Sequence, residues 1–139
     1  MRYHPITKET NMGYRSDVHA LFYTTRKEEL SLLKLYIDEN FPGELLCYLK
    51  AIDSNRIYGY EMICNNVKWY ESYPDVKAFN AFKGKYLALL DGPYMDEAWH
   101  RKWCYEFVQL GEETEDIEYE KSANTENALS VSRQIEVDY

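Results

Sequence analysis

The sequence has few cysteines and no long apolar run, and each shortage excludes a class of protein. Three cysteines, an odd number with no CxxC spacing, indicate free thiols in a reducing compartment rather than a disulfide framework. No window approaches the ~20 apolar residues that a membrane helix needs, and no apolar signal segment opens the chain. Internal repeats and low-complexity segments are also missing. We expect a cytoplasmic protein without membrane contact.

Catalytic and metal-binding signatures are missing as well. The chain contains no GxSxG, GxxxxGK[ST], GxGxxG or HExxH pattern, and no cysteine lies in a catalytic signature. His100 and Cys104 are four residues apart, but His4 and His19 are not placed to complete a set of three or four ligands. We therefore predict no cofactor and no metal, and an enzyme is the less favoured class.

What is present is enough for one folded domain. Of 139 residues, 45% are apolar and 16% are aromatic, which can repay the ordering of the chain around a single core. Fourteen tyrosines suit a binding surface, or rings that face inward from strands. Residues 1–11 lack any period and end before Met12-Gly13, so they indicate either an N-terminal extension or sequence upstream of an alternative start. We exclude them from the core and expect one domain over 12–139.

The first half predicts a strand, a helix and a meander. Val18, Ala20 and Phe22 share one face of a strand over 17–25, which leaves His19 on the other face, exposed or half-buried. Thr25 and Glu28 form a capping box that starts a helix, and Pro42-Gly43 ends it. The helix has a broad apolar stripe that comprises Leu30, Leu32, Leu33, Leu35, Tyr36, Ile37 and Phe41. Strands over 45–52 and 56–64 flank a turn, and a second turn at Asn65-Asn66 leads to a third strand over 67–70.

The second half predicts a helix and three strands. Pro74 fits the first turn of a helix that ends at Asp91-Gly92-Pro93, and 94–101 adds one helical turn. Strands follow over 102–110, 116–121 and 128–138, the last of which closes the sheet. The fold class is α+β, with a mainly antiparallel sheet of about six strands and two amphipathic helices on one face.

A known family is similar to this chain in several short stretches: GYRSDV (13–18), DENFP (38–42), VKWYESYPDV (67–76) and YEFV (105–108) with GEE (111–113). The family consists of small, largely uncharacterised proteins of tailed bacteriophages, and the resemblance covers about residues 12–139. It implies a setting, a phage accessory protein that acts inside a bacterium, and it implies no activity and no site residues.

The negative charge is concentrated in the last third of the chain. Residues 1–90 hold 12 Lys and Arg against 11 Asp and Glu, whereas residues 91–139 hold 4 against 13. Such a segment repels nucleic acid and attracts basic partners. The densest run has six acids in nine residues: Glu112, Glu113, Glu115, Asp116, Glu118 and Glu120.

The acidic run has two interpretations. If 116–121 is a strand, Asp116, Glu118 and Glu120 point to one face while Ile117 and Tyr119 point inward. Such a row of carboxylates could imitate a phosphate backbone and occupy a basic cleft. The alternative is a solvated face on an edge hairpin, where charge discourages aggregation. The run lacks the Asp/Asn alternation and central glycine of an EF-hand loop.

A second candidate surface is aromatic. Trp69, Tyr70 and Tyr73 lie close together in the sequence, and these residue types are enriched at the centres of protein interfaces. They suit a partner contact, or packing at the rim of the core. A stacking platform for nucleic acid is not expected, because such platforms lie in positive grooves and this chain is acidic.

The leading hypothesis is therefore a phage-encoded acidic binding protein that inhibits or redirects a host nucleic-acid-handling or defence complex, of the anti-CRISPR or anti-restriction type. Its partner would be a host protein or nucleoprotein complex with a basic surface, without direct contact to nucleic acid. A small enzyme that acts on a nucleotide or nucleic-acid defence signal is one alternative. A homo-oligomeric structural protein is another, and a homodimer stays open.

Overall fold

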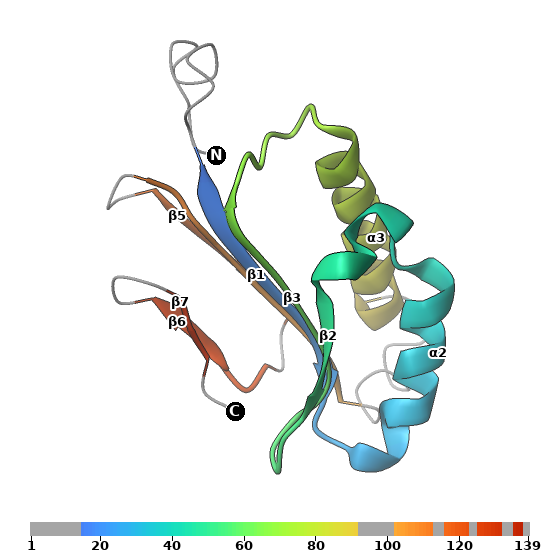
Figure 1. Cartoon of the computed structure of the whole chain (residues 1–139). Coiled ribbons are helices and arrows are strands. Elements are labelled where there is room, and N and C mark those ends of the chain that lie inside the picture. Colours follow the sequence, from blue (N-terminus) through green and yellow to red (C-terminus); the bar gives the residue numbers. More distant parts are fainter. Residues whose placement is uncertain (1–14, 92–101, 113–115, 123–124, 132–134, 138–139) are drawn as a thin grey trace.

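The main sheet has five antiparallel strands in the order β2-β3-β1-β4-β5 (Figure 1). The computed structural model describes residues 15–91, 102–112, 116–122, 125–131 and 135–137. The strands are β1 (Ser16–Thr24), β2 (Leu49–Asp53), β3 (Tyr58–Val67), β4 (Trp103–Leu110) and β5 (Ile117–Lys121). The predicted α+β class is confirmed, with five strands in the main sheet rather than about six.

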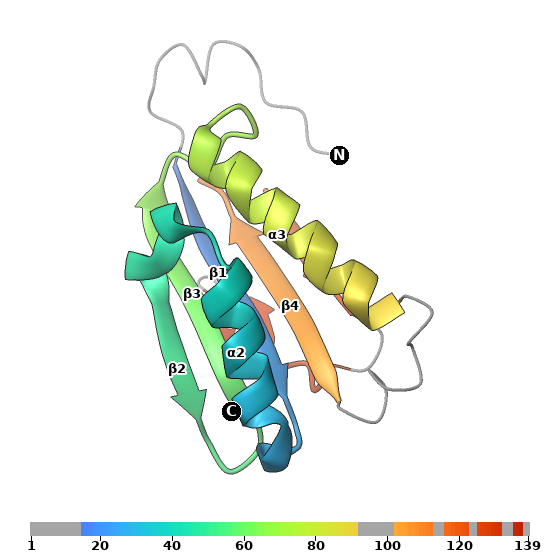
Figure 2. The same cartoon turned by 90° about the vertical axis from the view of Figure 1, so that its right-hand side faces the viewer.

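Two helices cover one face of this sheet, as predicted. Helices α2 (Leu30–Asn40) and α3 (Pro74–Asp91) lie side by side over it (Figure 2). Two short 3-10 segments, η1 (Lys27–Glu29) and η2 (Gly43–Tyr48), precede α2 and β2. The predicted start of α3 at Pro74 and its end at Asp91 are both confirmed.

Aromatic rings fill the space between the helices and the sheet. Phe22 of β1 is fully buried, and its ring centroid lies 5.2 to 6.2 Å from five other rings. These rings belong to Phe41, Phe79, Phe82, Tyr86 and Tyr105. Edge-to-face and tilted pairs dominate, which are the arrangements that the ring quadrupole favours. The period-two pattern of β1 and the helical stripe of α3 thus meet in one core.

A second core lies on the other face of the sheet. Two short strands, β6 (Leu129–Val131) and β7 (Ile135–Val137), pair only with each other and stand on the side opposite the helices (Figure 1). The buried residues of this core come from β1, β2, β4, β6 and the neighbouring loops: Leu21, Tyr23, Ile52, Ile57, Cys104, Val108, Ala128 and Leu129. The prediction that 128–138 closes the main sheet is wrong, because β6 and β7 pair with each other and lie over the sheet face (Figure 1).

The predicted turn at Asn65-Asn66 is a β-bulge. Ser16 pairs with Val67 and Val18 pairs with Cys64, so β3 carries one extra residue over this interval. Asn66 has a φ of 57° and donates its backbone N–H to the Asp17 carboxylate at 2.8 Å. A left-handed asparagine serves a bulge as well as a reversal. Residues 67–70 therefore do not form a third meander strand, and β1 takes the place beside β3.

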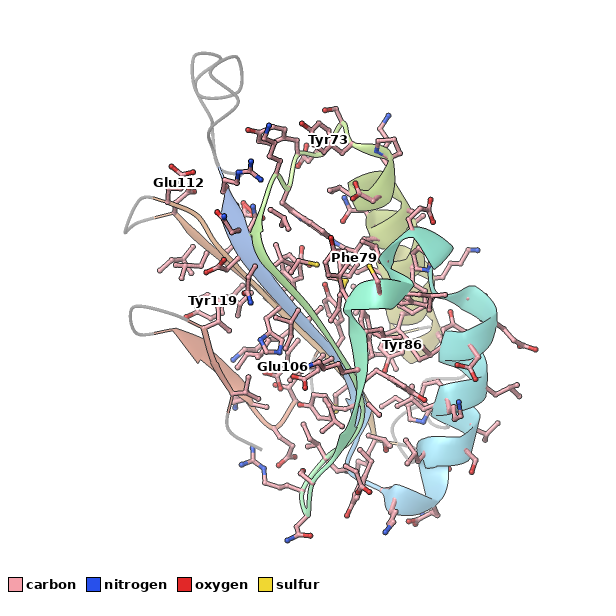
Figure 3. All side chains as sticks on the ribbon, viewed as in Figure 1. Tyr73, Phe79, Tyr86, Glu106, Glu112 and Tyr119 are labelled. Carbon is pink, nitrogen blue, oxygen red and sulfur yellow. The ribbon has the colours of Figure 1, made fainter. Side chains whose placement is uncertain are left out.

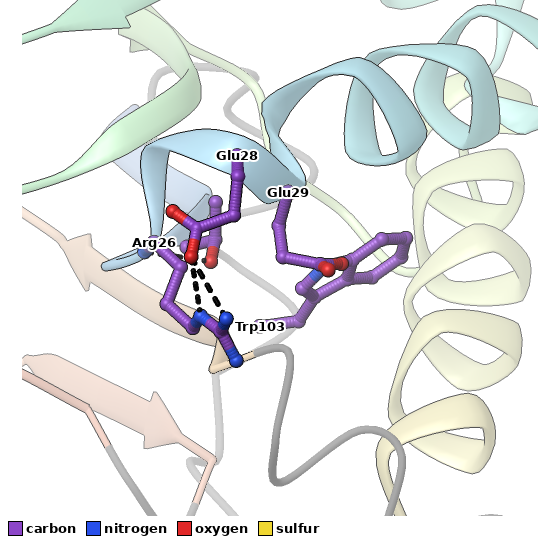
Figure 4. A network of polar contacts seen from close by, with 5 residues as sticks. Arg26, Glu28, Glu29 and Trp103 are labelled. Atoms are coloured by element: carbon purple, nitrogen blue, oxygen red, sulfur yellow. Dashed lines mark hydrogen bonds and ion pairs between the residues drawn. The ribbon is translucent and has the colours of Figure 1, made fainter.

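The predicted capping box is also wrong. Arg26, not Thr25, precedes η1, and no side chain caps the segment. Instead the guanidinium of Arg26 holds the Glu28 carboxylate at 2.8 and 3.0 Å, and the indole of Trp103 donates to Glu29 at 3.2 Å (Figure 4). The bond between Trp103 and Glu29 ties the start of the helical layer to the start of β4.

Several finer predictions for α2 and its surroundings differ from the structure. Leu33 and Ile37 face the core, but Leu32 and Leu35 are 45% and 53% exposed, so the apolar stripe is narrower than predicted. Residues 45–48 belong to η2 rather than to a strand, although β2 and β3 do form the predicted hairpin. The predicted helical turn over 94–101 lies outside the described residues.

Candidate functional site

The described acids of the run lie at one edge of the main sheet, where β5 is the last strand in the order and pairs with β4. Asp116 precedes β5 and is buried, and its carbonyl accepts the Gly111 N–H at 2.7 Å. Glu112 is exposed, and its carboxylate accepts the backbone N–H of Arg15 at 2.5 Å (Figure 3). Glu113 and Glu115 lie outside the described residues. The run therefore contains acids in quite different surroundings.

Glu120 is engaged within the chain. It sits opposite Phe107, on the face that the helices cover. Lys83 of α3 contacts both of its carboxylate oxygens, at 3.1 and 3.2 Å, and the Tyr105 hydroxyl donates to it at 3.0 Å. Burial and, next, the Glu120 charge raise the pKa of Tyr105, which keeps this phenol protonated as a donor. Glu120 thus links α3 to the sheet edge.

Glu118 and Tyr119 occupy opposite faces of β5. Glu118 pairs with Gln109 and is half-buried. Tyr119 does not point into a core as predicted: it lies on the hairpin side of the edge strand β5, opposite Val108, and is 49% exposed (Figure 3). Asp116, Glu118 and Glu120 alternate as expected, but in the described residues they do not form a row of equally exposed carboxylates.

The aromatic segment packs against the rim of the helix-side core. Tyr70 is buried and meets the half-buried Tyr73 edge-on, with ring centroids 5.1 Å apart. The half-buried Trp69 packs edge-on against Phe79 at 5.5 Å. Tyr73 lies just ahead of α3 (Figure 3). These contacts fit the packing interpretation and leave only parts of Trp69 and Tyr73 at the surface.

The structure also brings together a buried polar row that the sequence did not reveal. His19, Tyr23, Glu61 and Glu106 lie on the second face, across the three central strands. Leu21 of β1 pairs with Glu61 on one side and with Glu106 on the other. All four polar side chains belong to residues at most 9% exposed. Buried titratable groups of this kind need partners, because an unpaired buried charge costs several kcal/mol.

Glu106 finds its partners in the C-terminal segment. The Tyr23 hydroxyl and the backbone N–H groups of Ala128 and Leu129 all donate to its carboxylate, the last two at 3.0 Å. The Tyr23 oxygen in turn accepts the Glu126 N–H at 2.7 Å. Burial, with the Glu106 hydrogen bond second, raises the pKa of Tyr23, so the phenol stays a donor. We call this group the Glu106 clamp: it comprises Glu106, Tyr23 and the backbone of 126–129.

His19 pairs with Glu61. Its Nε2 lies 3.0 Å from the Glu61 carboxylate, and both side chains are nearly inaccessible. Burial lowers the pKa of His19 and outweighs the opposing influence of Glu61, so the imidazole is neutral near pH 7. The prediction that His19 is exposed or half-buried is wrong, because both faces of β1 are covered.

One signal in the sequence could have pointed to this row. Glu106 interrupts an otherwise apolar and aromatic stretch, WCYEFV, and a charge inside such a strand indicates a paired buried group as readily as a solvated face. The period-two pattern alone assigned the polar face to solvent. It held no information about the hairpin that covers this face.

The geometry defines the class of protein as an α+β domain with a five-stranded antiparallel sheet, helices on one face and a hairpin on the other. No protein-family model matches the chain, and neither a curated protein nor a solved structure is significantly similar to it. Among the described residues, no group of three His, Cys, Asp or Glu side chains is arranged to hold a metal ion. Within the same residues, no helix combines the length and the apolar character that crossing a membrane requires.

Proposed function

We propose that the chain is a phage-encoded binding protein that occupies a basic surface of a host nucleic-acid-handling or defence complex. The observation that carries the proposal is the net charge of the last third, where 4 Lys and Arg stand against 13 Asp and Glu. A concentrated negative field steers an acidic protein toward basic surfaces and sets its specificity. The phage setting comes from the sequence resemblance.

The contacts of the acidic run narrow the surface that we propose. Asp116 is buried and Glu120 is bound by Lys83 and Tyr105, so these two acids contribute mainly to folding. The proposed contact residues are the exposed Glu112 together with Glu113 and Glu115, and the accessible parts of Trp69 and Tyr73 form a second contact region. Mimicry of a phosphate backbone is the mode of binding that we favour.

A pair of matched triple variants tests the proposal. Glu112, Glu113 and Glu115 are changed to lysine in one variant; the control changes Glu39, Glu44 and Asp53, three exposed acids outside both proposed contact regions, to lysine. Both changes alter the net charge equally. We expect the first variant to lose capture of a host complex from bacterial lysate, as read by mass spectrometry, and the control to keep it.

Ionic strength and the control variant distinguish a specific acidic contact from a general attraction by net charge. Capture by the unmodified chain should weaken strongly between low and physiological ionic strength, because exposed charges are screened. Equal loss in both variants would mean that total charge, not this surface, attracts the partner. Undiminished capture by the first variant would reject the acidic contact altogether.

A small enzyme is the second candidate, and the His19–Glu61 pair is the observation that favours it. A neutral imidazole held by a carboxylate is a common arrangement for a general base. Both side chains of the pair are nearly inaccessible, so a substrate would have to displace part of the cover of the second face to reach them. Hydrolysis of nucleotide signals that survives in a His19→Gln variant would reject this candidate.

A further inference from the structure

The outer side of the helical layer exposes several large apolar side chains. Leu32 and Leu35 of α2 are 45% and 53% exposed, and Leu89 of α3 is 38% exposed. The two helices lie side by side, with this outer side toward the viewer in Figure 2. Single exposed leucines need no explanation, but leucines that gather on neighbouring helices indicate a contact surface. We call the exposed residues of α2 and α3 together the outer helix face.

Contacts between aromatic rings show how the two helices are aligned. The ring centroid of Tyr36 in α2 lies 6.1 Å from that of Phe82 and 6.0 Å from that of Tyr86 in α3. The Phe41 ring, directly after α2, lies 5.2 Å from the Phe82 ring. Later positions of α2 therefore lie beside earlier positions of α3, and the helices are antiparallel (Figure 2). Residues 36–41 lie at the level of residues 82–86.

The exposed charges of the two helices are opposite in sign. On α2, Lys34 contacts Asp38 at 3.1 Å, so these two charges offset each other, and Glu39 is a further exposed acid. The exposed positions of α3 carry Lys77 and Lys85. Glu39 lies between positions 36 and 41, and Lys85 lies between positions 82 and 86. The acid on α2 and the base on α3 are therefore at the same level of the layer.

The exposed apolar side chains of the two helices also differ in size. On α2 they are the large Leu32 and Leu35, whereas α3 exposes the small Ala81 and Ala88 beside Leu89. Helices pack closely when large side chains of one lie against small side chains of the other. By size and by charge, α2 is therefore complementary to α3 rather than to another copy of itself.

We propose that two copies of the chain associate through the outer helix face, with α2 of each copy packed against α3 of the other. A two-fold axis parallel to the layer, above the line between α2 and α3, produces this arrangement. Such an axis preserves the levels along the layer and places α2 antiparallel to α3 of the second copy. Leu35 then meets Ala88 and Leu89 of the second copy, and Glu39 meets Lys85 of the second copy.

The charges of this face favour a second copy as the occupant. Each copy supplies the acidic helix for one contact and the basic helix for the other, so the match is complete without a third component. The contact is apolar at its leucines and charged beside them, as interfaces commonly are. Because only two helices per copy take part, we expect a dissociation constant in the micromolar range.

The inference does not depend on the proposed function. The outer helix face lies across the sheet from the β6–β7 hairpin (Figure 1), and Glu112 does not belong to it. The control variant of the capture experiment includes Glu39→Lys. It should therefore self-associate more weakly and still capture the host complex, because the two surfaces are separate.

Two leucines with the same exposure provide a matched test of the apolar contact. Leu35 and Leu46 are both 53% exposed, but Leu46 lies in η2, outside the outer helix face. Sedimentation equilibrium of the full chain from about 1 to 200 µM should show monomers and dimers. Leu35→Lys should raise the dissociation constant at least about tenfold, because it places a charge in an apolar contact. Leu46→Lys should leave it unchanged.

Charge reversal in separate chains tests the contact between Glu39 and Lys85. Glu39→Lys and Lys85→Glu should each weaken self-association about tenfold, because like charges would then face each other. An equimolar mixture of the two variants should associate nearly as tightly as the unmodified chain. In the mixed dimer one Glu–Lys contact is unchanged and the other is reversed in order. Interactions within one copy cannot produce this recovery.

Any of three results overturns the proposal. The unmodified chain stays monomeric over the whole concentration range; Leu46→Lys weakens the association as much as Leu35→Lys; or the mixture associates no better than either charge variant alone. All four substitutions are at exposed positions, and urea unfolding checks that each variant keeps its fold.

Discussion

The environment of His19 differs from the one that its position in the sequence predicts. It lies on the polar side of an alternating strand, yet it is buried and paired with Glu61 across β1 and β3. The loss of hydration is larger than the gain from the carboxylate, so burial lowers its pKa from 6.5. The neutral imidazole then belongs to the folded state and the charged form to the unfolded chain.

This imbalance predicts a pH dependence. Below pH 6.5 the unfolded chain binds a proton at His19 that the folded chain binds only at lower pH, so stability should fall as pH falls from about 7.5 to about 5.5. A His19→Gln variant should show a shallower decline, because glutamine keeps a donor to Glu61 and does not titrate. Urea unfolding of both proteins at several pH values measures the difference. Parallel curves for the two proteins would refute this account of His19.

Two glycines show how one residue type has opposite roles in two elements. Gly84 is exposed within α3, and a Cβ there would meet no atom within 4 Å. Gly59 lies in β3 opposite Tyr23, and a Cβ there would come within 2.2 Å of the Phe22 carbonyl oxygen. Gly84 lowers the stability of α3, although there is room for a larger side chain at this position. Gly59 allows the backbone of β3 to approach β1 closely.

Substitution of each glycine by alanine should therefore have opposite effects on stability. Gly84→Ala should stabilise the protein by about 0.5–1 kcal/mol, because alanine has less conformational freedom to lose than glycine. Gly59→Ala should destabilise it by roughly 3 kcal/mol or more, since backbone atoms would have to move. Urea midpoints give both values. A destabilising Gly84→Ala would mean that α3 is less regular around this position than the structure shows.

At the scale of the whole molecule, the sheet separates two cores that are held in different ways. The helix-side core is closed by a dense set of rings on α2, α3 and β1. The opposite core is closed by the β6–β7 hairpin, and within the described part of the chain this hairpin has no strand pairing with the main sheet. Its attachment depends on apolar contacts of Ala128 and Leu129 and on the Glu106 clamp.

A substitution within the Glu106 clamp should therefore weaken the attachment of the β6–β7 hairpin to the sheet. In Glu106→Gln an amide NH₂ replaces one of the oxygens that accept the Tyr23 hydroxyl and the two backbone N–H groups, so one donor faces another. We expect a loss of about 2–4 kcal/mol in the free energy of unfolding, since buried bonds to a charged acceptor are strong and an unpaired donor is costly.

Hydrogen exchange locates the effect of this substitution. Amides of residues 125–137 should exchange faster in Glu106→Gln, while those of α3 change less. Glu44→Gln, at an exposed position, serves as the control and should leave both stability and exchange unchanged. Unaltered protection of the hairpin in Glu106→Gln would show that apolar packing alone holds it.

Much of the fold followed from local patterns. The alternation in β1, the stripe and the proline of α3, and the extended runs of β4 and β5 each placed an element with bounds close to those observed. The free thiols agree with the structure as well. These patterns succeed because the sequence of a single segment already shows which of its faces is apolar and must be buried.

Only the tertiary structure determined which element packs against each of these faces. A left-handed asparagine at position 66 fits a turn and a bulge equally, and only the pairing of β3 with β1 selects the bulge. The alternation of β1 predicts an exposed or half-buried His19, and only the cover on the second face of the sheet makes this residue buried. The hydrogen bond from the Glu126 N–H to the Tyr23 hydroxyl oxygen joins residues that are 103 positions apart in the sequence. A local sequence pattern cannot predict a contact over that separation.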